Sequence, residues 1–354
     1  MTLGRNNTGT LVLKIALIAS ILLISTALAG AITIEETEQL TFDVNQRTPA
    51  WSPDGKLITY SSEQAIWVMN TDGSDQTRVY DTIAWEGEPS FSSDGKFIYY
   101  ATEHVQPFSS KFISIRVVEL ADKSNTSQIT ENADKRAPVM SPDGTKIAYL
   151  SKVSGNYDIW VMNPDGGKNQ QITDSANDEG APSWSPEGEM LAYSLEGNLW
   201  TVNLTNRVPV VLRNDTFENT HPVFNPDGTK IAFVSDRSGN SDIWVMNSNS
   251  LGIEQITFEN STQTYPAWSP DGDKIAFASN EGGDYNIWTL TLSDTDRPIE
   301  LGQDKELVME EEEFNILKEL EDFAKESPLR TLTILFAMSI FVILFFLRNF
   351  LKGL

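Results

Sequence analysis

Short runs of alternating apolar and polar residues recur along most of the chain, separated by turns rich in Ser, Pro, Asp and Gly. Alternation with a period of two is typical of a β-strand that buries one face. The clearest repeat is the heptad Pro-Ala-Trp-Ser-Pro-Asp-Gly at Pro49. Equivalent heptads begin at Pro89, Pro138, Pro182, Pro222 and Pro266, at intervals of 40, 49, 44, 40 and 44 residues. A period of about 40–45 residues is typical of the four-stranded blades of a β-propeller.

Each repeat predicts four strands. The first ends in Ser-Pro-Asp-Gly, where proline fixes φ and the glycine adopts the left-handed conformation that a tight hairpin requires. The second carries Ile or Leu and then Tyr or Phe at alternate positions, as at Ile58 and Tyr60, with alanine between them in four repeats. The third has an Ile-Trp-Val-Met pattern, as at 66–69, and the fourth is Gln-Ile-Thr at 128–130, 171–173 and 255–257. The alanines indicate a face crowded by the adjacent blade.

A further copy of the fourth strand, Gln39-Leu40-Thr41, precedes the first repeat. A propeller that closes with a terminal strand has no exposed sheet edge at the join. We therefore expect residues 37–42 to complete the sixth blade. Residues 298–301, with the sequence Pro-Ile-Glu-Leu, compete for the same place. The predicted fold is all-β, a six-bladed propeller over residues 37–302.

The repeats resemble the WD-like propeller repeats of the TolB family, marked by a Trp-Ser-Pro-Asp-Gly hairpin, an Ile-Ala-Tyr/Phe strand and an Ile-Trp/Tyr-Val-Met strand. The resemblance covers residues 39 to about 295 and implies a six-bladed propeller with a protein-binding or scaffolding role. It does not include the α/β domain that precedes the propeller in TolB, because only a signal-like segment precedes Gln39 here. A role in the TolB envelope system is therefore not carried over.

Both ends of the chain carry apolar segments. Residues 1–31 combine Arg5 and Lys14 with an apolar run and a small-residue pattern at 27–29, which predicts a signal peptide or, alternatively, an uncleaved signal anchor. Residues 329–347 predict a C-terminal transmembrane helix, followed by a basic tail at 348–354. The positive-inside rule places this tail in the cytoplasm and the propeller outside the cell membrane. The acidic composition, the missing cysteines and this anchor resemble archaeal surface proteins.

Residues 303–328 connect the propeller to the predicted helix. Positions 304–327 hold ten acidic residues and three lysines, a local net charge of 3 − 10 = −7. Apolar residues at helical spacing from Phe314 to Ala324 predict an amphipathic helix that ends at Pro328. We interpret the segment as a solvated stalk, with a packing face for a partner's membrane-proximal helix as the alternative.

Overall charge restricts the partners. Fifty acidic and 26 basic residues give a net charge of −24, which repels nucleic acid and anionic lipid. The chain has no cysteine, so it forms no disulfide and no thiolate site. Its two histidines exclude a multi-histidine metal centre, and we expect no cofactor and no metal. The expected partner is a protein or a surface polymer.

The residue before each repeat proline should lie at one mouth of the central channel, because it starts the innermost strand. These positions hold Thr48, Glu88, Ala137, Ala181, His221 and Tyr265. With Arg47 and Arg136 one residue earlier, the predicted binding residues are Arg47, Glu88, Arg136, His221 and Tyr265.

Enzymatic chemistry has little support in the sequence. There is no Gly-x-Ser-x-Gly nucleophile elbow. The carboxylate pairs Glu86 with Glu88 and Asp178 with Glu179 are most simply solvated loop charges. We therefore predict a binding module rather than an enzyme. The alternative is a glycan- or peptide-processing enzyme that uses Glu88 and His221 as acid or base.

Four sequons lie in polar stretches, at Asn125, Asn203, Asn214 and Asn260. Because the predicted topology puts the propeller outside the cell, these asparagines are candidate glycosylation sites.

Overall fold

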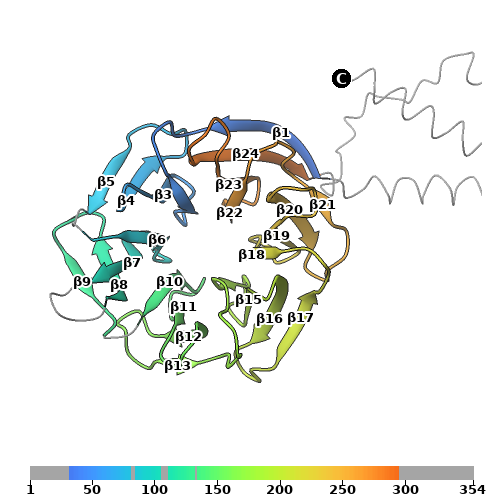
Figure 1. The fold of residues 1–354 in the computed structure, drawn as a ribbon. Helices are drawn as coiled ribbons and strands as arrows, with labels where there is room; N and C mark the ends of the chain where they lie inside the picture. Colours follow the sequence, from blue (N-terminus) through green and yellow to red (C-terminus); the bar gives the residue numbers. More distant parts are fainter. Residues whose placement is uncertain (1–31, 81–83, 105–110, 132–133, 295–354) are drawn as a thin grey trace, which may run out of the picture. The chain divides into compact units, whose positions relative to one another are not determined.

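The computed structural model describes residues 32–80, 84–104, 111–131 and 134–294. These residues form six four-stranded antiparallel sheets arranged in a ring, so the prediction of a six-bladed propeller is confirmed (Figure 1). In each blade the first strand lies nearest the axis and the fourth at the periphery. The predicted signal segment, stalk, transmembrane helix and tail lie outside the described residues.

The strands follow one pattern around the ring. Blade 1 is β2 (Arg47–Trp51), β3 (Leu57–Ser62), β4 (Ala65–Asn70) and β5 (Thr77–Tyr80). Blade 2 is β6 (Glu86–Phe91), β7 (Phe97–His104), β8 (Phe112–Glu119) and β9 (Thr126–Gln128). Blade 3 is β10 (Lys135–Met140), β11 (Ile147–Ser151), β12 (Asp158–Met162) and β13 (Gln170–Gln171). Blade 4 is β14 (Ser183–Trp184), β15 (Met190–Leu195), β16 (Asn198–Asn203) and β17 (Pro209–Arg213). Blade 5 is β18 (Asn219–Phe224), β19 (Lys230–Ser235), β20 (Asp242–Asn247) and β21 (Glu254–Gln255). Blade 6 is β22 (Gln263–Trp268), β23 (Lys274–Ser279), β24 (Asn286–Asp294) and β1 (Ile32–Gln39).

Strand β1 closes the ring by pairing with β24, with Ile32 opposite Asp294 and Gln39 opposite Trp288. The predicted closure by the segment before the first repeat is confirmed, but the strand starts earlier than residue 37. Ile32 and Ile34 pack against the core of blade 6. They therefore belong to the propeller and do not extend the apolar run before them. The competing segment 298–301 lies outside the described residues.

The core lies between neighbouring blades. Ile58 and Tyr60 are fully buried and pack with Ala276 and Ala278 of blade 6. Ile66, on the next strand, packs on the opposite side of blade 1 against blade 2. Each sheet thus buries apolar side chains on both faces, which explains both the alternating large residues and the alanines between them.

The Ser-Pro-Asp-Gly turns are held by side-chain hydrogen bonds. In blade 1 the hydroxyl of Ser52 donates to Asp54 Oδ1 (2.7 Å) and accepts the N–H of Leu57 (2.9 Å). Gly55 has φ = +69° and donates its N–H to the Ser52 carbonyl (2.9 Å). The predicted turn chemistry is confirmed, and these turns form the face of the ring at which the inner strands end.

The fourth strands end earlier than predicted. Strand β9 ends at Gln128 rather than at residue 130, because the hydroxyl of Thr130 accepts the N–H of Ile115 on the third strand (2.8 Å). The side chain of Thr130 therefore substitutes for a backbone carbonyl, and the peptide leaves the ladder. Thr173 and Thr257 make the same bond in blades 3 and 5.

Candidate functional site

The inner strands all begin at one face of the ring, which we call the mouth face. In five blades the residue before the repeat proline has a left-handed backbone: φ is +52° at Thr48, +55° at Glu88, +50° at Ala137, +52° at His221 and +55° at Tyr265. At each of these positions the pairing with the second strand shifts register. Such bulges redirect side chains, and each non-glycine residue held this way costs ~1–3 kcal/mol. Of the thirteen non-glycine residues with positive φ in the described part of the chain, five therefore lie at these repeat positions.

Blade 4 departs from this pattern. Its inner strand β14 contains only Ser183 and Trp184, and Ala181 is not among the described residues with positive φ. The predicted ring of six equivalent positions is thus built from five bulges and one irregular segment. The channel mouth, as used below, comprises Arg47, Glu88, Arg136, His221 and Tyr265.

Glu88 and Arg136 form an ion pair between blades 2 and 3. Arg136 donates from Nε to Glu88 Oε1 (2.9 Å) and also from Nη2, while the N–H of Ala137 donates to Oε2 (2.7 Å). The side chains of Arg136 and Glu88 are 35% and 16% exposed. Burial opposes the charge of Arg136, but the neighbouring Glu88 carboxylate outweighs it and raises the pKa of the guanidinium. Both Glu88 oxygens are engaged in holding this pair.

Tyr265 connects the other residues of the channel mouth. The His221 ring meets it edge-on, with centroids 4.5 Å apart. Burial raises the pKa of the Tyr265 hydroxyl and the charge of Glu88 adds to this, whereas Arg47 and Arg136 act in the opposite direction. The charges of Glu88, Arg47 and Arg136 thus act on Tyr265, and His221 contacts its ring, so the other four predicted residues all interact with this one side chain.

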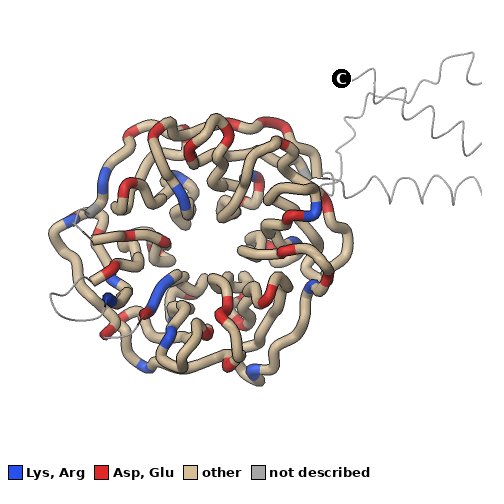
Figure 2. Tube along the Cα trace, in the orientation of Figure 1, with Lys and Arg blue, Asp and Glu red and all other residues tan. Residues whose placement is uncertain are grey.

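Arg47 is held by aromatic rings. Its guanidinium carbon lies 3.8 Å from the centroid of the Tyr285 ring, a cation–π contact. None of the ion pairs found among the described residues involves Arg47. Figure 2 shows acidic residues distributed around the whole ring, with fewer basic ones. The channel mouth, with two arginines and one glutamate, therefore differs in sign from the protein as a whole.

His221 is neutral near pH 7, because burial lowers the pKa of its imidazole to about 4. Its Nδ1 lies 3.0 Å from the hydroxyl of Thr220. The second histidine, His104, is elsewhere: it lies 2.7 Å from the Ser114 hydroxyl and stacks on Phe112 in blade 2. The two histidines have no common site.

A second ring of polar residues lies three positions before each repeat proline, and sequence reasoning missed it. Five of its members are less than 5% exposed: Gln46, Glu86, Glu179, Asn219 and Gln263. The Glu179 carboxylate accepts the N–H of Ile159 (3.0 Å) and the hydroxyl of Thr173, and burial raises its pKa to about 7. A polar residue at this fixed position in all six repeats, with Lys135 as the sixth, was the signal that could have revealed it.

The interpretation of the carboxylate pairs as solvated loop charges is wrong for Glu86 and Glu179, which are buried. Asp178 accepts the N–H of Tyr157 (2.8 Å), while Glu179 faces the inter-blade contact just described. Among the residues that the structure describes, no three His, Cys, Asp or Glu side chains are grouped to hold a metal ion. None of the described segments is a helix long and apolar enough to cross a membrane.

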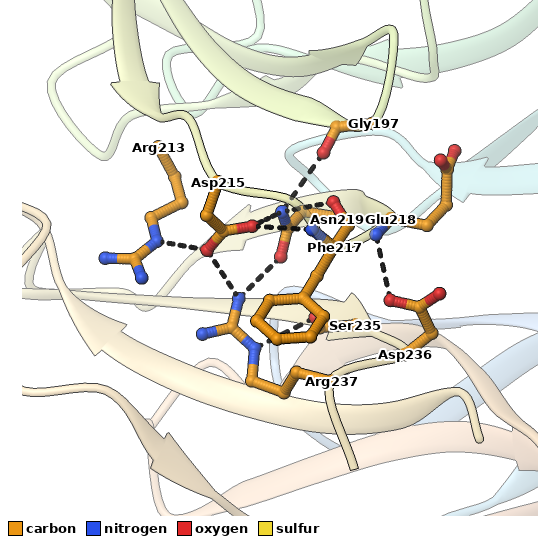
Figure 3. A network of polar contacts seen from close by, with 9 residues as sticks. All are labelled: Gly197, Arg213, Asp215, Phe217, Glu218, Asn219, Ser235, Asp236 and Arg237. Atoms are coloured by element: carbon orange, nitrogen blue, oxygen red, sulfur yellow. Dashed lines mark hydrogen bonds and ion pairs between the residues drawn. The ribbon is translucent and has the colours of Figure 1, made fainter. Parts of the chain in front are cut away.

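A polar network supports the mouth face beside blade 5 (Figure 3). Asp215 accepts from Arg213 Nε (2.7 Å), Arg237 Nη2 (3.3 Å) and Asn219 Nδ2 (2.8 Å). Burial alone would raise the pKa of Asp215, but these donors outweigh it and hold the pKa below its usual value. Asn219 also donates to the Phe217 carbonyl (3.0 Å), so the network fixes the connection between β17 and β18.

The candidate glycosylation sites are not equivalent. Asn125, Asn214 and Asn260 are exposed in connections between strands, whereas Asn203 is partly buried at the end of β16. Asn125 Nδ2 donates to the Glu119 carboxylate (2.6 Å).

The six blades pack against one another and form a closed β-propeller. Charged residues and left-handed backbone at the start of its inner strands form a candidate binding mouth. The family model PD40, described as the TolB beta propeller domain, matches residues 30–198 and 114–300. The chain belongs to this family, and the resemblance seen in the repeats is confirmed.

Relatives share only part of their length with this chain. The uncharacterized protein Atu1656 of Agrobacterium fabrum is 30% identical over 40% of this chain and 52% of its own length. The Tol-Pal system protein TolB of Anaeromyxobacter is 28% identical over 32% and 27%. A solved TolB structure from Agrobacterium tumefaciens is 25% identical, with a TM-score of 0.55, covering 61% of this chain and 77% of that one. An oligogalacturonate lyase with manganese, 17% identical over 73% of this chain and 80% of that one at a TM-score of 0.53, shows the shared fold alone.

Proposed function

We propose that the chain is a membrane-anchored, extracytoplasmic binding module that recognises a protein partner through its channel mouth. The observation that carries this proposal is Arg47, a cation at the start of β2 that is held by the Tyr285 ring and forms none of the ion pairs among the described residues. Strained bulges beside it orient neighbouring side chains. Such a site suits an acidic group of a partner protein or, as the alternative ligand, of a surface polymer.

The topology supports access to this mouth. Strand β1 leads into the inner strand β2, so Gln39 lies toward the mouth face and Ile32 toward the opposite face. Asp294 pairs with Ile32 and thus also lies away from the mouth. Both described ends of the propeller, Ile32 and Asp294, therefore lie on the face opposite the channel mouth.

The enzymatic alternative fits the geometry less well. Both oxygens of Glu88 already accept hydrogen bonds from blade 3, so this carboxylate is committed to the ion pair with Arg136. His221, with a pKa of about 4, is a weak base that contacts Tyr265 and Thr220. The Tol-Pal name of one relative supports a protein-binding role, and the net charge of −24 argues against nucleic acid.

Chemical crosslinking of the chain in its own membrane tests this function. We expect a reproducible protein partner whose capture falls in Arg47→Ala and Tyr265→Phe, and is unchanged in Lys56→Ala on the opposite face. Equal capture by all variants would contradict the proposed site. Turnover of a glycan or peptide that is lost in Glu88→Gln or His221→Ala would establish the enzymatic alternative instead.

A further inference from the structure

Three phenylalanines are exposed on the mouth face. Phe42, Phe217 and Phe258 are 75%, 41% and 64% exposed. Each lies in a connection from an outer strand to the next inner strand: β1 to β2, β17 to β18, and β21 to β22. These connections end a few residues before the inner-strand bulges, so the three rings occupy successive blade junctions around the mouth. We call them the Phe arc.

An acidic residue directly follows each member of the Phe arc: Asp43, Glu218 and Glu259. All three acids are exposed. A ring face attracts cations through its quadrupole, and an adjacent carboxylate adds charge–charge attraction. The repeated Phe–acid pair therefore combines an apolar contact with a preference for Lys or Arg.

Phe217 is held in place before any partner binds. Its N–H donates to Asp215 Oδ1 (3.1 Å), and its carbonyl accepts from Asn219 Nδ2 (3.0 Å). The Arg237 guanidinium carbon lies 5.3 Å from the centroid of its ring. These contacts belong to the network in Figure 3, from which the Phe217 ring projects over Arg237. An ordered anchor loses less entropy on binding than a free one.

We propose that the Phe arc is a docking surface for a basic, apolar segment of the partner protein. This inference rests on the proposed function and adds the chemistry of the partner beside the mouth. Charge complementarity selects this occupant. A second copy of the chain would bring like charges opposite Asp43 and Glu259, and an anionic lipid surface would be repelled in the same way.

Binding of defined peptides to the purified full chain tests the proposal. Three fluorescent peptides of equal length alternate Leu with Lys, Leu with Glu, or Leu with Ser. We expect the Leu/Lys peptide to bind at least ~10-fold more tightly than the other two, since a desolvated aromatic anchor is worth a tenfold change or more. The double variant Phe42→Ser with Phe258→Ser should lose at least ~10-fold in affinity for that peptide.

Two controls distinguish binding at the Phe arc from general attraction of a basic peptide to the acidic protein. Leu251→Ser removes an exposed apolar side chain, 65% exposed, from the connection between β20 and β21 on the opposite face. The test variant Asp43→Asn with Glu259→Gln removes two negative charges beside the Phe arc. The control variant Glu187→Gln with Glu189→Gln also removes two, but on the turn between β14 and β15. Neither control should weaken binding, whereas Asp43→Asn with Glu259→Gln should.

Several outcomes would overturn the inference. The first is equal affinity for the three peptides, and the second is a loss of affinity in the control variants as large as that in the Phe variant. The third is binding to anionic vesicles, or self-association in sedimentation experiments, that depends on Phe42 and Phe258. Arg47→Ala distinguishes this inference from the proposed function. If Arg47→Ala reduces partner capture while the double Phe variant does not, the mouth is the binding site and the Phe arc is not.

Discussion

Trp51 donates its indole N–H to the carbonyl of Ala267, 216 residues later in the chain (3.0 Å). Trp184 and Trp268 make the same bond to Val139 and Val223 on the preceding inner strands, at 3.0 and 3.2 Å. The tryptophan at the third position of the repeat heptad therefore connects neighbouring blades around the axis. Repeats with Phe or Met at this position have no N–H to offer there.

Trp51→Phe should destabilise the propeller by ~1 kcal/mol, because the Ala267 carbonyl loses its donor while most apolar contact is kept. Urea denaturation of the chain 32–294 measures the change. Trp67→Phe is the matched control, since the Trp67 indole N–H makes no hydrogen bond among the described residues. A loss in Trp67→Phe as large as that in Trp51→Phe would show that ring volume, not the hydrogen bond, matters.

Removing β1 should open the ring. A chain that starts at Arg47 lacks Ile32 and Ile34 in the core, and the N–H of Ile287 loses the Thr41 hydroxyl (2.8 Å). It also exposes the edge of β24. We expect a lower melting temperature than for the chain 32–294, followed by circular dichroism. Identical melting temperatures would mean that β1 contributes nothing to closure.

The fold was predictable because its determinants repeat. Six heptads with the same turn chemistry report blade number and strand order without any long-range information. The ends of strands were less predictable. The hydroxyl of Thr130 takes the place of a backbone carbonyl as acceptor for the N–H of Ile115, and the pattern of apolar residues does not indicate this.

The position of the candidate site residues in the fold was predictable, but their backbone conformation was not. Register placed Glu88 and Tyr265 near the start of inner strands, and both lie there in β6 and β22. The left-handed backbone at these non-glycine residues had no sequence signal, because Glu and Tyr rarely adopt it. Burial of Glu179 depends on the contact between two blades, so composition alone presented it as a surface charge.

Membrane orientation remains a prediction from the positive-inside rule. Protease added to intact cells should release the propeller by cleaving within residues 303–328. Release should give a fragment that retains the Phe arc and the channel mouth. Protection in intact cells, followed by cleavage after lysis, would place the propeller on the cytoplasmic side instead.

His221 should titrate far below an exposed histidine. Its neutral form stabilises the fold fully above the ordinary pKa of 6.5, and this contribution is lost as the pH falls through about 4. NMR of the imidazole protons should give a midpoint near 4. A His104→Gln variant assigns the signals, because the chain has only two histidines. A midpoint near 6.5 would mean that the ring is hydrated rather than shielded from water beside Tyr265.

Glu179→Gln should stabilise the propeller at and above neutral pH. Burial raises the Glu179 pKa from 4.5 to about 7, so the folded state favours the protonated acid. The resulting stability is fully present below pH 4.5 and is lost as the pH rises through about 7, by an amount on the order of 2–3 kcal/mol. Glutamine stays neutral and keeps an oxygen to accept from Ile159.

The comparison with the parent chain isolates this effect from the other carboxylates. Urea denaturation at pH 4.5 and pH 8 should show no advantage for Glu179→Gln at the lower pH and a clear advantage at the higher pH. Glu187→Gln, an exposed control on the opposite face, should show none at either. If Glu179→Gln were destabilising at pH 8, the Glu179 carboxylate would have to be ionised and stabilised by its donors, including Thr173. In the expected case, the free energies of unfolding of the parent chain and of Glu179→Gln separate as the pH rises. The pH at which they separate reports how strongly burial raises the pKa of Glu179.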